Sequence, residues 1–291
     1  MPSNEQRRQA AKRKLERQLE RRAEKSRKRK QMTIGASILG VVLVIAAGAV
    51  VYSLTKSDGS SDNTADGAAT TQESPSAAPM PTARAKALPA TVDCSYPADG
   101  QGAAKPVNAP SATGVSAQGT VTVNLDTSQG PIGLELDRAE SPCTVNSMVS
   151  LASQGYLNDT PCHRLSTTGL KILQCGDPTG QGTGGPGYGF NNEFPTDQYD
   201  PNDPALSSPV TYARGTIAMA NTGQPGSNGS QFFLVYDDSP LPPNYTVFGT
   251  IDDAGLATIE KIAAAGDDGS MSAGGGKPNT PVQITTATVA A

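Results

Sequence analysis

The chain has 291 residues, a formal net charge of −4, four cysteines, one histidine and no tryptophan. The charge is distributed unevenly, because residues 1–30 carry +9 and the remaining residues carry −13. A single histidine excludes zinc sites built on two or three histidines, and no two cysteines form a CxxC pair, so we expect neither a metal site nor a cofactor.

An uncharged run of 22 residues, 33–54, follows the basic segment. A helix of this length crosses a hydrocarbon core of roughly 30 Å, which predicts one transmembrane helix. A cleaved signal peptide is the alternative, but its apolar part is usually about 7 to 15 residues. The Lys and Arg excess before the run predicts a cytoplasmic N-terminus and an extracytoplasmic remainder, that is, a single-pass signal-anchor protein of the plasma membrane.

The basic segment, residues 1–32, contains no aromatic residue that could stack on bases, so we expect no nucleic-acid binding. Attraction to anionic lipid headgroups is worth about 1 kcal/mol per basic residue near the surface. We therefore expect this segment to orient the chain and to contact anionic headgroups.

Residues 55–117 are rich in Ser, Ala, Thr and Pro and poor in large apolar side chains, which predicts a disordered stalk. Cys94 indicates that the end of this stalk is tied to the folded domain. Four cysteines permit three pairings, and the sequence does not choose among them.

A folded domain is expected over residues 118–291. Alternating apolar residues at 120–126 and 131–137 predict a β-hairpin. Ser141 as N-cap, Pro142 after it and Gly155 as a stop predict a helix, and a second helix is expected at 256–264. Further strands are expected at 162–165, 170–175, 216–220, 231–236, 245–251 and 282–289. Short strands with only two helices are typical of an antiparallel barrel or sandwich.

The segment 162–249 holds the strings CHRL, LQCGDPTGQGTGG, AMANTGQPGSNGSQFF and YTVFG. In this order and spacing they resemble the cyclophilins, a family of peptidyl-prolyl cis-trans isomerases. The resemblance implies an eight-stranded antiparallel barrel with two capping helices, and an isomerase that binds proline-containing polypeptides and assists the folding of extracytoplasmic proteins.

Carried over by position, the resemblance implies three catalytic residues, which are Arg164, Gln174 and Asn221. It implies a set of substrate-binding residues, which are His163, Ile172, Gly182, Ala220, Thr222, Gln231, Phe233, Leu241 and Tyr245. Strand alternation points His163 away from Arg164, so a structural role is the alternative for the histidine.

Three positions depart from the family pattern, and one of them is Tyr245, which stands where a histidine is usual before VFG. Lys171 stands where a pocket phenylalanine is usual, and Pro240 stands where a tryptophan is usual. A non-catalytic module that binds proline-containing peptides or serves adhesion is therefore the alternative function. The presence of Arg164 argues against it, since isomerisation needs a permanent cation rather than a titrating group.

Overall fold

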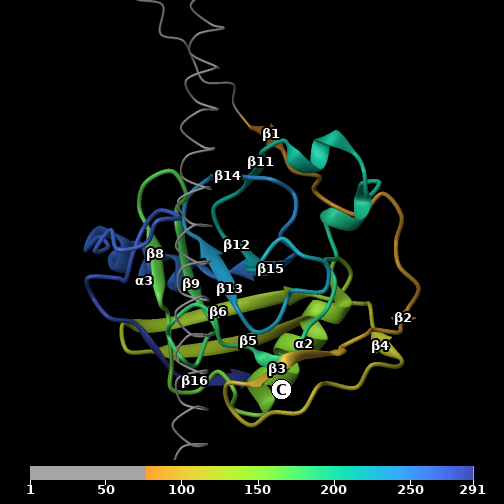
Figure 1. Ribbon diagram of the computed structural model, residues 1–291, viewed down its shortest axis with the longest axis horizontal. Helices are drawn as coiled ribbons and strands as arrows, with labels where there is room; N and C mark the ends of the chain where they lie inside the picture. Colours follow the sequence, from red (N-terminus) through yellow and green to blue (C-terminus); the bar gives the residue numbers. More distant parts are fainter. Residues whose placement is uncertain (1–76, 291) are drawn as a thin grey trace, which may run out of the picture. The chain divides into compact units, whose positions relative to one another are not determined.

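A nine-stranded antiparallel sheet forms the centre of the computed structural model, which describes residues 77–290 (Figure 1). In spatial order its strands are β7 (Thr160–Pro161), β16 (Gln283–Val289), β5 (Thr120–Thr127), β6 (Gly130–Asp137), β15 (Val247–Ile251), β12 (Thr216–Met219), β13 (Phe232–Val235), β9 (Ile172–Cys175) and β8 (Arg164–Ser166). The basic segment 1–32, the expected membrane helix 33–54 and the stalk residues 55–76 lie outside the described residues.

The two end strands of this sheet are neighbours in the chain, separated only by Cys162 and His163. Two residues span only a few ångströms, so the sheet is curled until its edges meet at this point. The sequence predicts one strand here, at 162–165, and eight strands in all. The structure corrects both, because the chain forms two short strands that pair with β16 and β9 respectively.

Two helices accompany the sheet, as expected, α2 (Pro142–Ser153) and α3 (Asp253–Ala264). Helix α3 begins earlier than predicted because the Asp252 side chain accepts from the Gly255 amide over 2.7 Å. Ser141 does not cap α2, because its hydroxyl donates to the Val247 carbonyl instead. The half-buried carboxylate of Glu193 replaces it, accepting from the amides of Cys143 and Thr144 at the start of α2. No helix within residues 77–290 is long and apolar enough to span a bilayer.

The main core lies between the sheet and the helices. Alternate residues of the predicted hairpin enter it, and the most buried of them are Val123, Leu125, Ile132, Leu134 and Leu136. Helix α2 adds Val145, Met148 and Leu151, and α3 adds Leu256, Ile259 and Ile262. Alternation in the sequence therefore identifies the hairpin's part of this core correctly.

Residues 77–117, here called the N-terminal strap, are ordered against the domain and are not the disordered stalk expected for 55–117. The strap contributes β1 (Ala78–Pro79), β2 (Thr91–Val92), β3 (Ala98–Ala103) and β4 (Val115–Ser116). Strand β2 pairs with β4, and β3 pairs with β10 (Pro186–Tyr188). Strand β1 pairs with β11 (Val210–Tyr212), which pairs with β14 (Ser239–Leu241). Two short 3₁₀ helices, η1 (Thr196–Gln198) and η2 (Pro204–Ser207), precede β11.

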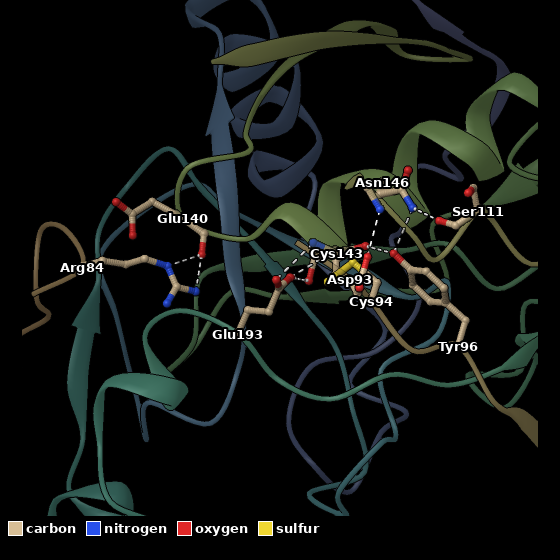
Figure 2. The surroundings of a disulfide bond; sticks show 11 residues. Arg84, Asp93, Cys94, Tyr96, Ser111, Glu140, Cys143, Asn146 and Glu193 are labelled. Carbon is tan, nitrogen blue, oxygen red and sulfur yellow. Dashed lines mark hydrogen bonds between the residues drawn. A yellow bond between two sulfur atoms is a disulfide. The ribbon is translucent and has the colours of Figure 1, made fainter. Parts of the chain in front are cut away.

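Covalent and polar contacts hold the strap, which explains why its composition misleads. A disulfide joins Cys94 to Cys143 of α2, and the Tyr96 hydroxyl donates to the Cys143 carbonyl over 2.7 Å (Figure 2). The Arg84 side chain is only 7% exposed, pairs with Asp197 at 2.7 Å and donates to the Glu140 carbonyl. The expected tie through Cys94 is confirmed, and the second disulfide joins Cys162 to Cys175.

Candidate active site

The predicted arginine and glutamine belong to one row of residues across four adjacent strands. Arg164 on β8 faces Gln174 on β9, Gln174 faces Phe233 on β13, and Phe233 faces Ala218 on β12. Successive residues on a strand point to opposite sides of a sheet. The neighbours of this row, Leu165, Leu173, Ile217 and Leu234, are fully buried in the main core. The row therefore lies on the face of the sheet that points away from that core.

Hydrogen bonds connect the polar members of this face into a chain. Arg164 Nη1 donates to Gln174 Oε1 over 3.3 Å, and Gln174 Nε2 donates to Gln231 Oε1 over 3.0 Å. Gln231 Nε2 then donates to the Gly184 carbonyl over 3.1 Å. Each amide is thereby held in one orientation, with an oxygen toward Arg164 and an N–H toward the loop after β9.

Arg164 is half-buried, and burial lowers the pKa of its guanidinium. The group nevertheless keeps its charge, because an arginine is not deprotonated in proteins. Its Nε and Nη2 donate to the carbonyls of Gly274 and Ala273, each over 3.1 Å. These two acceptors were not predicted, since backbone carbonyls leave no signal in a sequence.

An apolar cluster lies beside this polar chain and contains the predicted pocket walls. Its buried members are Ile172, Val210, Tyr212, Ala218, Phe233 and Val235, with Ala220, Leu241 and Tyr245 among the half-buried residues packed against them. The rings of Phe233 and Tyr245 meet edge to face, with centroids 5.7 Å apart. The structure therefore brings five predicted residues together, and they are Ile172, Ala220, Phe233, Leu241 and Tyr245.

Tyr212 belongs to this cluster, although the motif resemblance does not assign it to the site. Its hydroxyl donates to the Tyr245 carbonyl over 2.9 Å, and burial raises its pKa well above the ordinary range. The ring also packs against Phe233, with centroids 6.3 Å apart. Tyr212 thus fixes the backbone that carries Tyr245, and its alternation with Val210 on β11 was the available signal.

The side chain of Asn221 is directed into a cluster of asparagines. Its Nδ2 donates to the Asn244 carbonyl over 2.9 Å and lies 3.3 Å from the Oδ1 atoms of Asn192 and Asn228. The donors of this amide are therefore used within the protein. A contact between Asn221 and an extended ligand would come from its backbone, and exposed Thr222 follows it on the rim.

His163 is only 5% exposed, so the expected direct contact with substrate is not supported by its position. Its ring lies under the loop after β9, where a Cβ on Gly182 would be 3.5 Å from His163 Nε2. Burial lowers its pKa, which favours the neutral imidazole. Gly182 itself is exposed above the ring, and the structural alternative for His163 agrees with this arrangement.

Asp177 organises that loop, and sequence reasoning missed it. The carboxylate is fully buried and accepts from the amides of Thr179, Gln181, Gly182 and Thr183. Burial by itself would raise its pKa, but the hydrogen bonds from Thr179 and Gly182 outweigh burial and hold the pKa below its usual range. Asp177 thereby fixes the loop whose Gly184 carbonyl ends the polar chain.

Two of the departures from the family pattern, Lys171 and Pro240, lie at the edge of the site. Lys171 directs its ammonium to the Thr167 carbonyl over 2.7 Å, and Pro240 is exposed on β14. Neither interrupts the contacts among Arg164, Gln174 and Phe233. Among residues 77–290, no group of His, Cys, Asp and Glu side chains is arranged to hold a metal ion.

Comparison with known proteins identifies relatives with the same motifs. The model of the family described as cyclophilin type peptidyl-prolyl cis-trans isomerase/CLD matches residues 121–289. A Mycobacterium leprae protein named probable peptidyl-prolyl cis-trans isomerase B is 59% identical over 197 residues, covering 66% of this chain and 65% of that protein. A Mycobacterium tuberculosis protein of the same name is 57% identical over 197 residues, and the alignment covers 66% of this chain and 62% of that protein. The chain therefore spans slightly less than two thirds of the length of these relatives.

A solved Cryptosporidium parvum cyclophilin type isomerase, crystallised in the presence of the dipeptide Ala-Pro, is 28% identical; the alignment covers 58% of this chain and 99% of that chain, with a TM-score of 0.47. The family match covers more than half of the sequence and includes every strand of the row described above. The chain belongs to the cyclophilin-type peptidyl-prolyl cis-trans isomerase family.

Proposed function

We propose that the protein catalyses cis/trans isomerisation of X-Pro bonds in polypeptides outside the membrane and so assists their folding. The observation that carries this proposal is the position of Arg164, a fixed cation joined through Gln174 to the strand that holds the buried ring of Phe233. An apolar cluster beside a fixed cation suits a proline ring and its amide nitrogen.

The chemistry requires only that arrangement. Rotation about the X-Pro bond has a barrier of about 18 to 20 kcal/mol because amide resonance is broken. The prolyl nitrogen regains a lone pair as it rotates, and a hydrogen bond from Arg164 stabilises that state. A rate gain of about 10⁵ corresponds to about 7 kcal/mol, which fixed electrostatics and positioning can supply.

The roles of the neighbouring residues follow from their contacts. Gln174 and Gln231 orient one another and keep amide groups beside the cation, where an extended polypeptide can pair with them. Phe233, Leu241 and Tyr245 surround the ring of the proline. His163 and Asp177 lie beneath this surface and support it.

The proposed location is the outer side of the plasma membrane. The uncharged run 33–54, preceded by +9 in residues 1–30, supports a single anchor with a cytoplasmic N-terminus. The same basic residues would contact anionic headgroups on the cytoplasmic side. Protease added to spheroplasts should then remove the C-terminal domain and leave an N-terminal fragment. Protection of the domain until lysis would contradict this location.

A protease-coupled isomerisation assay on the full chain in detergent tests the activity. The proposed function predicts faster cis-to-trans exchange of an Ala-Pro peptide than in buffer alone. Binding of the peptide without any acceleration would instead favour the alternative, a non-catalytic module in which Lys171 and Pro240 have altered the pocket.

A further inference from the structure

A short loop between α3 and β16, residues 271–276, contacts the Arg164 side chain and orients it. Two carbonyls of this loop, on Ala273 and Gly274, accept from Nη2 and Nε of the guanidinium. Gln174 accepts from Nη1. An arginine side chain has five N–H groups, so these contacts use three of them and leave two for a ligand.

All three acceptors are electrically neutral. Within residues 77–290 the ion pairs join Arg84 to Asp197 and Arg214 to Glu260, and Arg164 takes part in neither. A carboxylate beside the guanidinium would offset its charge, whereas a carbonyl or an amide oxygen orients it without adding an opposite charge. The whole positive charge of Arg164 therefore remains available to the prolyl nitrogen.

The loop is fixed to the strand that carries the arginine. Gly276 and Leu165, the residue after Arg164, exchange two backbone hydrogen bonds of 2.8 and 2.9 Å. Gly275 has a φ of +74°, and a Cβ at this position would lie 2.1 Å from the Leu165 carbonyl oxygen. Only glycine permits this close approach, so the register of the loop against β8 depends on Gly275.

We propose that residues 271–276 form an arginine clamp, a positioning element that fixes the plane of the Arg164 guanidinium and leaves its two free donors for the X-Pro amide. This inference rests on the proposed function for its kinetic consequence and on geometry alone for the orientation of the arginine. Once the clamp is displaced, Arg164 samples several orientations, and the turnover number falls more than the affinity for substrate.

Gly275→Ala displaces the clamp, and Gly269→Ala is its matched control. Gly269 lies in the same connection with a φ of +62°, but no atom lies within 4 Å of the position that its Cβ would occupy. Both substitutions place alanine in a left-handed conformation, and only the first pushes against β8. Asp268→Ala provides a second route, because this exposed carboxylate accepts from the Ser270 and Lys277 amides that frame the loop.

Selective ¹⁵N labelling of arginine, in the full chain in detergent, reports whether the Arg164 side chain is held in place. This measurement does not require catalytic activity. The Nε–H signal of Arg164 is identified by its loss in Arg164→Ala. The clamp predicts slow exchange of this proton with solvent in the wild type and in Gly269→Ala, and exchange at least tenfold faster in Gly275→Ala and Asp268→Ala. Equal exchange in all four proteins would overturn the clamp whether or not the chain is an isomerase.

The kinetic test uses a double-mutant cycle. Gly275→Ala should lower kcat at least tenfold with KM changed less than threefold, while Gly269→Ala stays within twofold of the wild type. The isomerisation rate of the Arg164→Ala variant is measured by exchange NMR. In that background, Gly275→Ala should change the rate less than twofold. A tenfold loss of the isomerisation rate in that background would contradict the clamp. It would show that the loop stabilises the fold and does not act through the orientation of Arg164. A wild type without activity would refute the proposed function, and the exchange signal would still test the clamp.

Discussion

Gln174 receives a hydrogen bond from Arg164, its directly opposed partner on the adjacent strand, and passes one on to Gln231. The cation is therefore the first member of a polar chain that ends on the backbone of the loop after β9. Neutral groups supply every contact of its guanidinium that the structure describes. Rigidity and full charge are the two properties that X-Pro rotation requires of a donor.

Removal of the cation should abolish most of the acceleration. Arg164→Ala is expected to lower kcat/KM by two to three orders of magnitude, about 3 to 4 kcal/mol by analogy with the loss of one oxyanion donor. Arg164→Lys should restore it only in part, because an ammonium lacks the rigid fork that the clamp and Gln174 hold. Arg214→Ala, which breaks only the exposed pair with Glu260, is the control and should behave as wild type. Full activity of Arg164→Ala would refute the mechanism.

The rate should depend little on pH. No proton moves during rotation, Arg164 stays charged, and burial keeps the pKa of His163 below its ordinary value. We therefore expect kcat/KM to be nearly flat from pH 6 to pH 9 in an exchange NMR assay that needs no coupling protease. A bell-shaped profile centred near 7 would show that His163 takes part in the chemistry.

The sequence predicts the regular parts of this fold well. Alternation identifies the hairpin of β5 and β6, and Pro142 and Gly155 mark the two ends of α2, because each signal is local. The site residues follow from the motif resemblance rather than from local patterns. The structure places three of them, Gln174, Phe233 and Tyr245, close together. Long-range partners were missed, since nothing local marks Glu193 as the cap of α2 or Asp177 as the centre of a loop.

For the N-terminal strap the prediction from composition is wrong, because it expects disorder where the structure has ordered strands. The residues of the strap contain few large apolar side chains, which is why the composition predicts disorder. Order comes instead from a disulfide, from β pairing with distant strands and from the ion pair between the buried Arg84 side chain and exposed Asp197. None of these contacts leaves a pattern within the strap itself.

Stability, unlike the rate, should fall in acid. Burial lowers the pKa of His163 in the folded protein, so below about pH 6.5 only the unfolded chain takes up this proton, and the free energy of unfolding falls with pH. The lowered pKa of Asp177 acts with the same sign in a lower window, below about pH 4. Urea midpoints from pH 8 to pH 5 should decline in the wild type. They should decline less in His163→Gln, and parallel curves would contradict the assignment of a neutral buried imidazole.

Removal of the strap should destabilise the domain. A chain that begins at residue 118 loses β1 to β4, Arg84 and Cys94, and it leaves Cys143 unpaired. The Cys94–Cys143 link has a sequence separation of 49, for which the chain-entropy relation gives about 4 kcal/mol. We expect the chain from residue 118 to lose at least this much free energy of unfolding relative to a chain from residue 77.

A double variant separates the covalent from the non-covalent part of that loss. Cys94→Ser with Cys143→Ser, in the chain from residue 77, removes the disulfide and keeps Arg84 against Asp197 and β1 against β11. Because these contacts remain, urea unfolding should place this variant between the two chains. Strand β11 also pairs with β14, which carries Leu241, so the chain from residue 118 should show a raised KM for an X-Pro peptide while the double variant keeps the wild-type value. Equal urea midpoints for the chains from residues 77 and 118 would show that the strap lies on the domain without stabilising it.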